Sequence, residues 1–184
     1  MSFPLEKINC DKVYLRNIDI SDAEAIFDIY SDAEVTRFLD FPVMKDVNHA
    51  ENFIDDVLLG YLNGDLLEWA IIENKKDTFI GTIHFAQWDY KHGHAKIGFA
   101  LNKNWWGRGI MKDLLSPFIQ FGFKELRLNR IQANINPLNN ACKKLFEERG
   151  FQREGLLRER YMLLGQPHDI IIFSLLKNES ELVI

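Results

Sequence analysis

The feature that most constrains the fold of this chain is the segment Asn104-Trp105-Trp106-Gly107-Arg108-Gly109-Ile110-Met111. An apolar run that alternates like a strand precedes this segment, and an apolar pattern of helical period follows it. Glycine permits positive φ and keeps side chains away from a ligand, and the first N–H groups of a helix have no partner within it. A strand, a glycine turn and a helix start therefore predict an anion site, to which Arg108 adds a formal charge. The alternative is a plain strand-to-helix turn without a ligand.

The length, composition and net charge of the chain narrow the classes of protein to which it can belong. The chain has 184 residues, of which 47% are apolar and 27% charged, as in an ordinary globular domain. A net charge of −5 argues against a surface that binds nucleic acid. The two cysteines, Cys10 and Cys142, form no disulfide framework, and there is neither an apolar run of membrane length nor a signal peptide. We therefore expect one cytoplasmic domain, residues 1–184, without a membrane segment.

The first third of the chain predicts helices after one short strand at residues 13–16. Ser21-Asp22-Ala23-Glu24 has the pattern of a capping box, which predicts a helix start at this point. Further helices are predicted at residues 32–39 and 47–62, the second of them ended by Gly64.

The middle of the chain predicts an antiparallel meander, with strands at residues 66–73, 78–88 and 95–101. The helix after the glycine segment contains Pro117, which removes one backbone hydrogen bond and predicts a kink.

The last third predicts a strand at residues 129–135 and a helix that Asn139 caps and Gly150 ends. Two further strands are expected at residues 151–164 and 169–176, and residues 165–167 connect them. Residues 178–184 are expected to be frayed. The fold class is therefore α+β, with a mostly antiparallel sheet.

Ten short motifs follow one another along the chain, each present once. They are Trp69-Ala70-Ile71-Ile72, Ile80-Gly81-Thr82-Ile83, Ile97-Gly98-Phe99, Trp106 to Met111, Phe121-Gly122-Phe123, Leu128-Asn129-Arg130-Ile131, Asn136 to Ala141, Glu147 to Phe151, Glu154-Gly155 and His168-Asp169. In this order and spacing, they resemble the GNAT acetyltransferase superfamily in its ribosomal-protein N-acetyltransferase-like (RimJ/RimL) branch. The resemblance implies the GNAT fold, a mixed and mostly antiparallel sheet with splayed central strands and helices on both faces.

The resemblance also implies that acetyl-CoA lies in the gap between the splayed strands. Its diphosphate would bind the backbone N–H groups of Gly107, Arg108, Gly109, Ile110, Met111 and Lys112, and its arm would run along Phe99, Ala100 and Leu101. Asn139 matches an asparagine that contacts the arm, although a simple helix N-cap explains it equally well. The diphosphate pattern of the superfamily, Q/R-x-x-G-x-G/A, is not kept at Trp106 and Met111.

The implied reaction is direct attack of a primary amine on acetyl-CoA in a ternary complex. Phe146 stands where some relatives have a tyrosine acid, and Cys142 stands where the ribosomal branch often has a serine. A helix start would lower the pKa of a thiol, so Cys142 is a candidate general acid. The alternative for Cys142 is a small side chain that faces the core.

No side chain is an obvious general base. Two positions for a glutamate base fall on Asn134 and Lys96, while Glu159 and Tyr161 lie near where another base would sit. An α-amine has a pKa of about 7.7 to 8.0, so water is a sufficient base for one. Because Tyr161 lies near one of these family positions, it is the second catalytic candidate beside Cys142.

The acceptor is expected to be a protein N-terminal amine or a small amine. Candidates for its cleft are Phe38, Phe41, Trp69, Trp88, Tyr90 and Tyr161, with Asp32, Glu34 and Asp40 as partners for a cation, although core packing is the favoured interpretation for Trp69. His92-Gly93-His94 is interpreted as a solvated turn, so no metal is expected. Dimers occur in the family, so a homodimer is one expectation.

Two other function classes remain open at this point. The unusual residues Phe146, Asn134 and Lys96 would also suit a non-catalytic module that binds acyl-CoA. A protein-interaction domain that does not bind CoA is the third interpretation.

Overall fold

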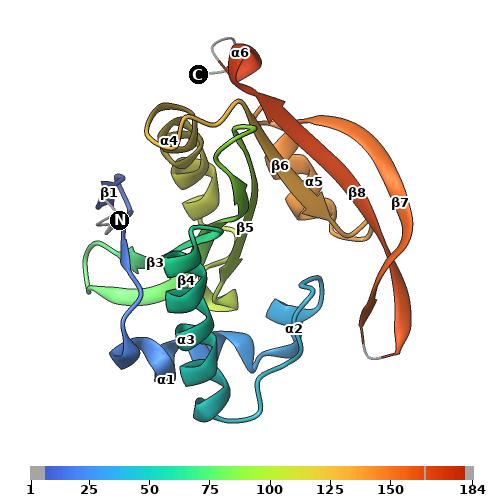
Figure 1. Ribbon diagram of the computed structural model, residues 1–184. Helices are drawn as coiled ribbons and strands as arrows, with labels where there is room; N and C mark the ends of the chain where they lie inside the picture. The colour runs from blue at the N-terminus through green and yellow to red at the C-terminus, as the bar shows by residue number, and fades with distance from the viewer. Residues whose placement is uncertain (1–6, 164, 181–184) are drawn as a thin grey trace.

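The computed structural model describes residues 7–163 and 165–180. One eight-stranded sheet, in the order β1-β2-β3-β4-β5-β6-β8-β7, organises the molecule (Figure 1). The strands are β1 (Ile8–Asn9), β2 (Val13–Asn17), β3 (Leu66–Glu73), β4 (Thr78–Asp89), β5 (His94–Leu101), β6 (Arg130–Ile135), β7 (Gln152–Leu163) and β8 (Gln166–Leu176). The α-helices are α1 (Ala23–Tyr30), α2 (Ala33–Thr36), α3 (Val47–Asn63), α4 (Ile110–Lys124), α5 (Asn140–Glu147) and α6 (Lys177–Ser180). Two short 3-10 helices, Ile20–Asp22 and Lys103–Trp105, precede α1 and α4.

The sheet splits between its two central strands. All neighbouring strands pair antiparallel except β5 and β6, which run parallel. Their ladder is limited to His94–Lys96 against Arg130–Gln132, whereas β5 stays paired with β4 as far as Leu101. Beyond Lys96, β5 and β6 therefore diverge, and the splayed centre expected from the resemblance is present.

Helices cover both faces of the sheet, and each face has its own apolar core. Ile26 and Ile29 of α1 and Ile54 of α3 pack with small and apolar residues of β3 and β5 on one face. Leu114 and Phe118 of α4 pack on the other face, where aromatic rings meet edge to face or stacked. The periodicity that predicted these helices thus marks the residues that they bury.

Capping side chains set where the helices begin and end. The predicted capping box exists, but it begins at Asp19 and uses Asp22, so the assignment to Ser21 and Glu24 was wrong. The chain enters a 3-10 turn at Ile20, which places the orphan N–H groups two residues earlier than the pattern suggested. The end of α3 is also set by a cap. This helix stops at Gly64, whose φ of 77° is left-handed, as predicted.

Several element boundaries differ from the prediction. The second helix is short: Asp32 caps it, but it ends at Thr36 rather than at residue 39. β8 begins at Gln166 because the β7–β8 hairpin stays paired up to Leu163 and Gln166, so most of the expected connection is strand. Residues 178–180 belong to α6 rather than to a frayed end. Residues 164 and 181–184 lie outside the described residues.

The helix α4 continues through Pro117 from Ile110 to Lys124. None of the helices among the described residues is both long and apolar enough to cross a membrane.

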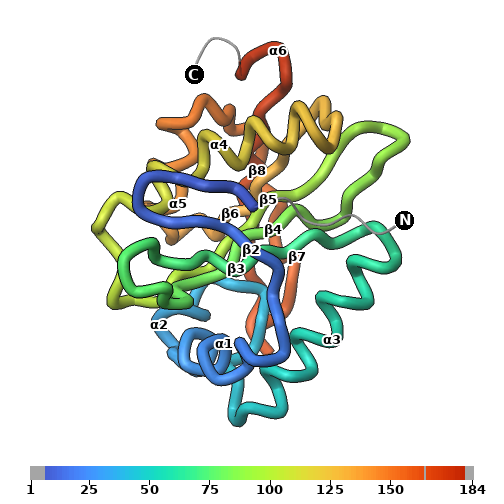
Figure 2. Tube along the Cα trace, turned by 90° about the vertical axis from the view of Figure 1, so that its left-hand side faces the viewer, coloured from blue at the N-terminus to red at the C-terminus, as the bar shows by residue number. Residues whose placement is uncertain are grey.

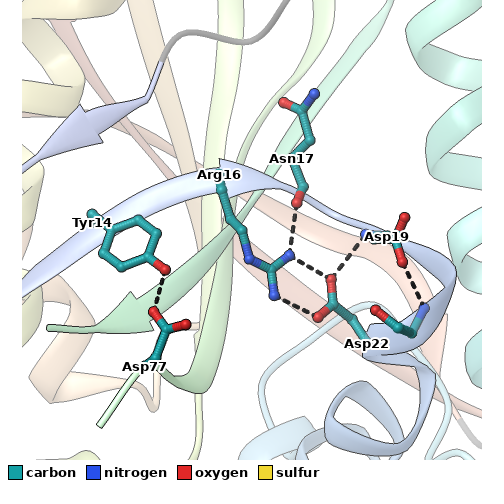
Figure 3. A network of polar contacts seen from close by, with 7 residues as sticks. Tyr14, Arg16, Asn17, Asp19, Asp22 and Asp77 are labelled. Carbon is teal, nitrogen blue, oxygen red and sulfur yellow. Dashed lines mark hydrogen bonds and ion pairs between the residues drawn. The ribbon is translucent and has the colours of Figure 1, made fainter. Parts of the chain in front are cut away.

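A polar network fastens β2 to the start of α1 (Figure 3). Two nitrogens of Arg16 donate to the carboxylate of Asp22 at 2.7 and 2.6 Å, and the backbone N–H of Asp19 donates to the same carboxylate at 2.8 Å. Tyr14, which lies on β2 like Arg16, donates its hydroxyl hydrogen to Asp77. This network fixes the direction in which the chain enters the helices beneath the splayed strands.

Candidate active site

A cavity of about 890 Å³ lies where β5 and β6 diverge. The predicted cofactor residues that line it are Phe99, Ala100, Leu101, Gly107, Gly109, Ile110, Met111, Lys112 and Asn139. The catalytic candidate Cys142 lines it as well. Arg108 and Tyr161 are not part of its wall. The cavity therefore brings together most of the residues that the sequence selected.

The glycine segment has the backbone that an anion site needs. Gly107 and Gly109 have φ values of 71° and 75°, in the left-handed region that side chains disfavour. A Cβ added to Gly107 would meet no atom within 4 Å, so the space in front of it is open. The indole N–H of Trp106 donates to the carbonyl of Leu101 at 2.7 Å and ties this segment to the end of β5.

The first turn of α4 faces the same space. Gly109 is the N-cap and offers no side-chain acceptor, so the first N–H groups of a 15-residue helix are free for a ligand. Met111, which departs from the small residue of the pattern, is 8% exposed and packs into the core. Its bulk therefore does not obstruct the helix N-terminus, and the segment fits a diphosphate.

Two cations that the sequence analysis missed lie beside this segment. Lys12, in the β1–β2 turn, donates to the carbonyl of Arg108 at 3.2 Å and pairs with Asp113 at 2.7 Å. The blue β1–β2 turn accordingly lies close to the start of α4 (Figure 2). Arg149 donates to the carbonyl of Lys112. Arg108 itself is exposed, with its guanidinium carbon 4.7 Å from the centroid of the Trp105 ring. Because Lys12 is 96 residues from Arg108 in the chain, no local pattern could have revealed it.

The free edge of β5 lies along the same cavity. Between Ile97 and Leu101 this strand pairs only with β4, so by alternation half of its peptide groups point into the gap. Asn139 lies across the gap, where its side-chain oxygen accepts from the N–H of Cys142 at 3.0 Å. Asn139 thus caps α5 and lines the cavity, so the two interpretations of this residue are compatible.

The thiol of Cys142 does not have the pKa expected for it. Burial raises the pKa of Cys142 to about 12, whereas a position at a helix start predicted a lowered value. The N-terminal turn of α5 is satisfied by Asn139, and the apolar surroundings disfavour a thiolate. The thiol consequently stays protonated at neutral pH.

The half of the cavity on the side of the sheet that faces α1 is lined by α1, α2 and the segment after α2. Of the acceptor candidates, Phe38, Phe41, Glu34 and Asp40 line the cavity. Asp32 instead pairs with Lys103 at 2.6 Å. The remaining aromatic candidates lie elsewhere: Trp69 is fully buried in the core, Trp88 packs against that core, and Tyr90 is 83% exposed.

Comparisons with known proteins agree with this geometry. The family model described as Acetyltransferase (GNAT) domain matches residues 12–152. The chain belongs to the GNAT acetyltransferase family. It is 35% identical to "Uncharacterized N-acetyltransferase p20" of Bacillus licheniformis, over 95% of this chain and 98% of that protein. It is 25% identical to the ribosomal protein uS5-alanine N-acetyltransferase of Escherichia coli, over 94% and 91% of the two chains.

The solved structures confirm the GNAT fold. The Mycobacterium smegmatis RimJ structure, in complex with CoA-disulfide, superposes with a TM-score of 0.86 at 20% sequence identity, covering 96% of this chain and 90% of that one. The predictions of fold class, family and acetyltransferase activity are therefore confirmed. The general reaction of the family is transfer of the acetyl group of acetyl-CoA to an amine.

The positions that GNAT enzymes use for side-chain chemistry are unusual in this member. Phe146 has no polar hydrogen and cannot donate a proton; it is 2% exposed and packs against Phe99 and Phe151. Asn134 and Lys96 line the cavity. Burial, and then the charge of Arg160, lower the pKa of Lys96.

Tyr161 lies on β7, outside the wall of the cavity. Its hydroxyl accepts from Nδ2 of Asn136 at 3.4 Å, and its ring stacks on His168 with centroids 5.2 Å apart. Asn136 does line the cavity, so Tyr161 reaches it only through this amide. Glu159 has a φ of 50° and donates its N–H to Asp169, in the irregular part of the β7–β8 ladder.

Glu68 of β3 and His84 of β4 are among the polar residues that line the cavity without having been selected from the sequence. Within residues 7–163 and 165–180, no group of three or more His, Cys, Asp or Glu side chains could hold a metal ion.

Proposed function

We propose that this GNAT protein acetylates a primary amine by direct attack inside the cavity, with acetyl-CoA and acceptor entering from opposite sides. The observation that carries the proposal is the continuity of the cavity. It joins the glycine segment and α4 to the residues of α1 and α2 through the gap beside β5. A reaction between two bound molecules needs such a passage, because their reacting atoms must come within about 3.5 Å of each other.

The cofactor roles follow from the chemistry of the walls. The N–H groups from Gly107 to Lys112 bind the diphosphate, with Lys12 and Arg108 adding positive charge. The peptide groups of Phe99, Ala100 and Leu101 bind the arm in the manner of an added strand. A backbone N–H of the same strand stabilises the oxyanion that forms when the thioester is attacked.

We propose a peptide N-terminal amine as the acceptor, with a small amine as the second candidate. The uS5-alanine N-acetyltransferase relative supports the first, since its name gives an alanine of a ribosomal protein as the substrate, and the nitrogen of an alanine residue is a free amine only at the start of a chain. Glu34 and Asp40 in the cavity wall supply negative charge that favours any ammonium group, and Phe38 and Phe41 supply apolar contact.

Release of free thiol from acetyl-CoA tests this function. The probes are an alanyl hexapeptide, the same peptide with a blocked N-terminus, and spermidine. We expect release above the hydrolysis background with the free alanyl peptide and none with the blocked peptide. Release with spermidine alone would move the proposal to small amines, and tight CoA binding without release for any probe would contradict it.

Tight CoA binding without release of thiol would support the alternative function, a non-catalytic module that binds acyl-CoA. Two observations favour that alternative: Phe146 has no proton to donate, and burial raises the pKa of Cys142. The general reaction of the family favours the enzyme instead.

Three further expectations remain proposals. Residues 1–184 work as one domain, and the free cysteines Cys10 and Cys142 suit a reducing cytoplasm. A homodimer is the third, and light scattering of the purified protein would test it.

A further inference from the structure

Glu68, His84 and Gly98 form a row across three strands on the acceptor side of the cavity. Glu68 is directly opposite His84 in the β3–β4 ladder, and His84 is directly opposite Gly98 in the β4–β5 ladder. Directly opposite residues of antiparallel strands point to the same face. Ala70 and Ala100, two residues along β3 and β5, belong to the core beneath α1 and α3, so this row faces those helices. All three residues of the row line the cavity.

The carboxylate of Glu68 and the ring of His84 face each other. Oε1 of Glu68 and Nδ1 of His84 are 3.6 Å apart. Glu68 is only 4% exposed, and Nδ1 of His84 is buried without a hydrogen-bond partner. A buried carboxylate is costly unless it has a partner, and this imidazole is the cation-forming group placed to be one. The charge of Glu68 also contributes, after burial, to the raised pKa of Tyr30.

The other edge of the imidazole lies over Gly98. A Cβ added to Gly98 would clash with Nε2 of His84 and would lie 2.7 Å from Cε1. Only glycine therefore leaves room for the ring on β5. Phe99, the next residue, begins the part of the strand proposed to hold the thioester. The ring edge with Nε2 therefore lies over the residue that precedes this part, while Nδ1 faces a carboxylate.

We propose that His84 is the general base of the reaction and that Glu68 is its positioning residue. This inference rests on the proposed function and supplies the base that the family positions Asn134 and Lys96 lack. Nε2 takes one proton from the acceptor ammonium, and the neutral amine attacks the acetyl carbon. The C–N bond forms first and gives the oxyanion, and the C–S bond breaks as the carbonyl forms again. The second amine proton goes to the thiolate, and the first leaves from the imidazolium to water.

The substrate class follows from the same surroundings. The groups that line this half of the cavity with the imidazole and can carry charge are Glu68 of β3, Lys96 of β5, Tyr30 of α1, Glu34, Arg37 and Asp40. Burial lowers the pKa of Lys96, and three of these groups, Glu68, Glu34 and Asp40, carry carboxyl groups that attract a cation. The acceptor is therefore an amine that arrives protonated, as an ammonium ion, and is neutralised in place.

The test compares His84→Gln with His92→Gln, a matched change of an exposed histidine in the β4–β5 turn. With the alanyl peptide or spermidine, whichever the wild-type protein acetylates, we expect His84→Gln to lower kcat by about 100-fold or more. The KM for acetyl-CoA should not change. His92→Gln should match the wild type. The decline of kcat/KM at acid pH should also change shape in His84→Gln, because a base that must be deprotonated has been removed.

Three further variants separate catalysis from structure. Added imidazole should restore part of the rate of His84→Ala, which a purely structural histidine would not allow. Gly98→Ala should lower kcat by displacing the ring, and Glu68→Gln should lower it less than His84→Gln does. Full activity of folded His84→Gln with an unchanged pH profile would overturn the inference while the acetyltransferase function stood. A wild-type protein that binds CoA but acetylates no probe would overturn both.

Discussion

At the residue scale, Cys142 shows how burial can reverse an expectation based on helix position. Because its pKa is raised to about 12, the thiol can donate a hydrogen bond to the departing sulfur but gives up its proton reluctantly. One such bond contributes about 1 kcal/mol, or roughly a fivefold to tenfold change in rate. We therefore predict that Cys142→Ala lowers kcat by about tenfold or less, with the affinity for CoA nearly unchanged.

The control for this prediction is Cys142→Ser, which keeps the size of the side chain and a donor, and should retain most of the rate. Steady-state kinetics and calorimetry with CoA measure both quantities. A loss of more than about 1000-fold in Cys142→Ala would mean that the thiol transfers its proton, because one hydrogen bond is too weak to account for it.

At the scale of elements, the junction between β5 and α4 depends on backbone conformation more than on side chains. Gly107 has a φ of 71° and open space in front of it. An alanine there costs about 1 to 2 kcal/mol of strain and points a methyl group at the proposed diphosphate. We predict that Gly107→Ala weakens CoA binding at least about tenfold, as measured by calorimetry.

Gly64 provides a matched control, because its φ is 77°, nothing lies within 4 Å of an added Cβ, and it ends α3 away from the cavity. Gly64→Ala should lose similar stability in thermal unfolding and bind CoA like the wild type. Equal weakening in both variants would show that strain alone is responsible, and the anion site would lose its support.

The strands β6, β8 and β7 are joined by an ion pair that responds to pH. Hydrogen bonds from Arg130 of β6, and then from Ser174 of β8, lower the pKa of Glu154 on β7 to about 2. The folded pKa is below the ordinary value of 4.5, so the stabilisation is complete above about pH 4.5 and disappears as pH falls toward about 2. Glu154 is 43% exposed, which limits the contribution to about 1 kcal/mol.

We predict that Glu154→Gln lowers the free energy of unfolding by about 1 kcal/mol or less at pH 7. Urea unfolding from pH 7 to pH 2.5 should show the difference from the wild type shrinking below about pH 4.5. A difference that is constant across this range would mean that packing, and not the charge, is lost in the variant.

At the scale of the whole molecule, the sequence predicted what is local and missed what the sheet brings together. Alternation and helical period placed the strands and helices, and Gly107 with Gly109 marked the junction correctly. Glu68 and His84 were overlooked because they are separated by 16 positions and meet only through the β3–β4 register. Lys12 was missed for the same reason, since a turn far away in the chain carries it to α4. Tyr161 was selected by its place in the order of motifs, but the irregular β7–β8 hairpin holds it outside the cavity wall.

The shape of the cavity also predicts the kinetic order of the reaction. The glycine segment lies at one side of the gap beside β5 and the acceptor residues lie at the other, so neither substrate has to leave before the other enters. A covalent acetyl-enzyme would need a thiolate at Cys142, which its raised pKa disfavours. We predict intersecting lines in double-reciprocal plots of initial rate against both substrates. Intact-mass spectrometry after incubation with acetyl-CoA alone should find an unmodified chain. Parallel lines together with the added mass of one acetyl group, absent in Cys142→Ala, would instead identify Cys142 as the nucleophile and exclude direct attack.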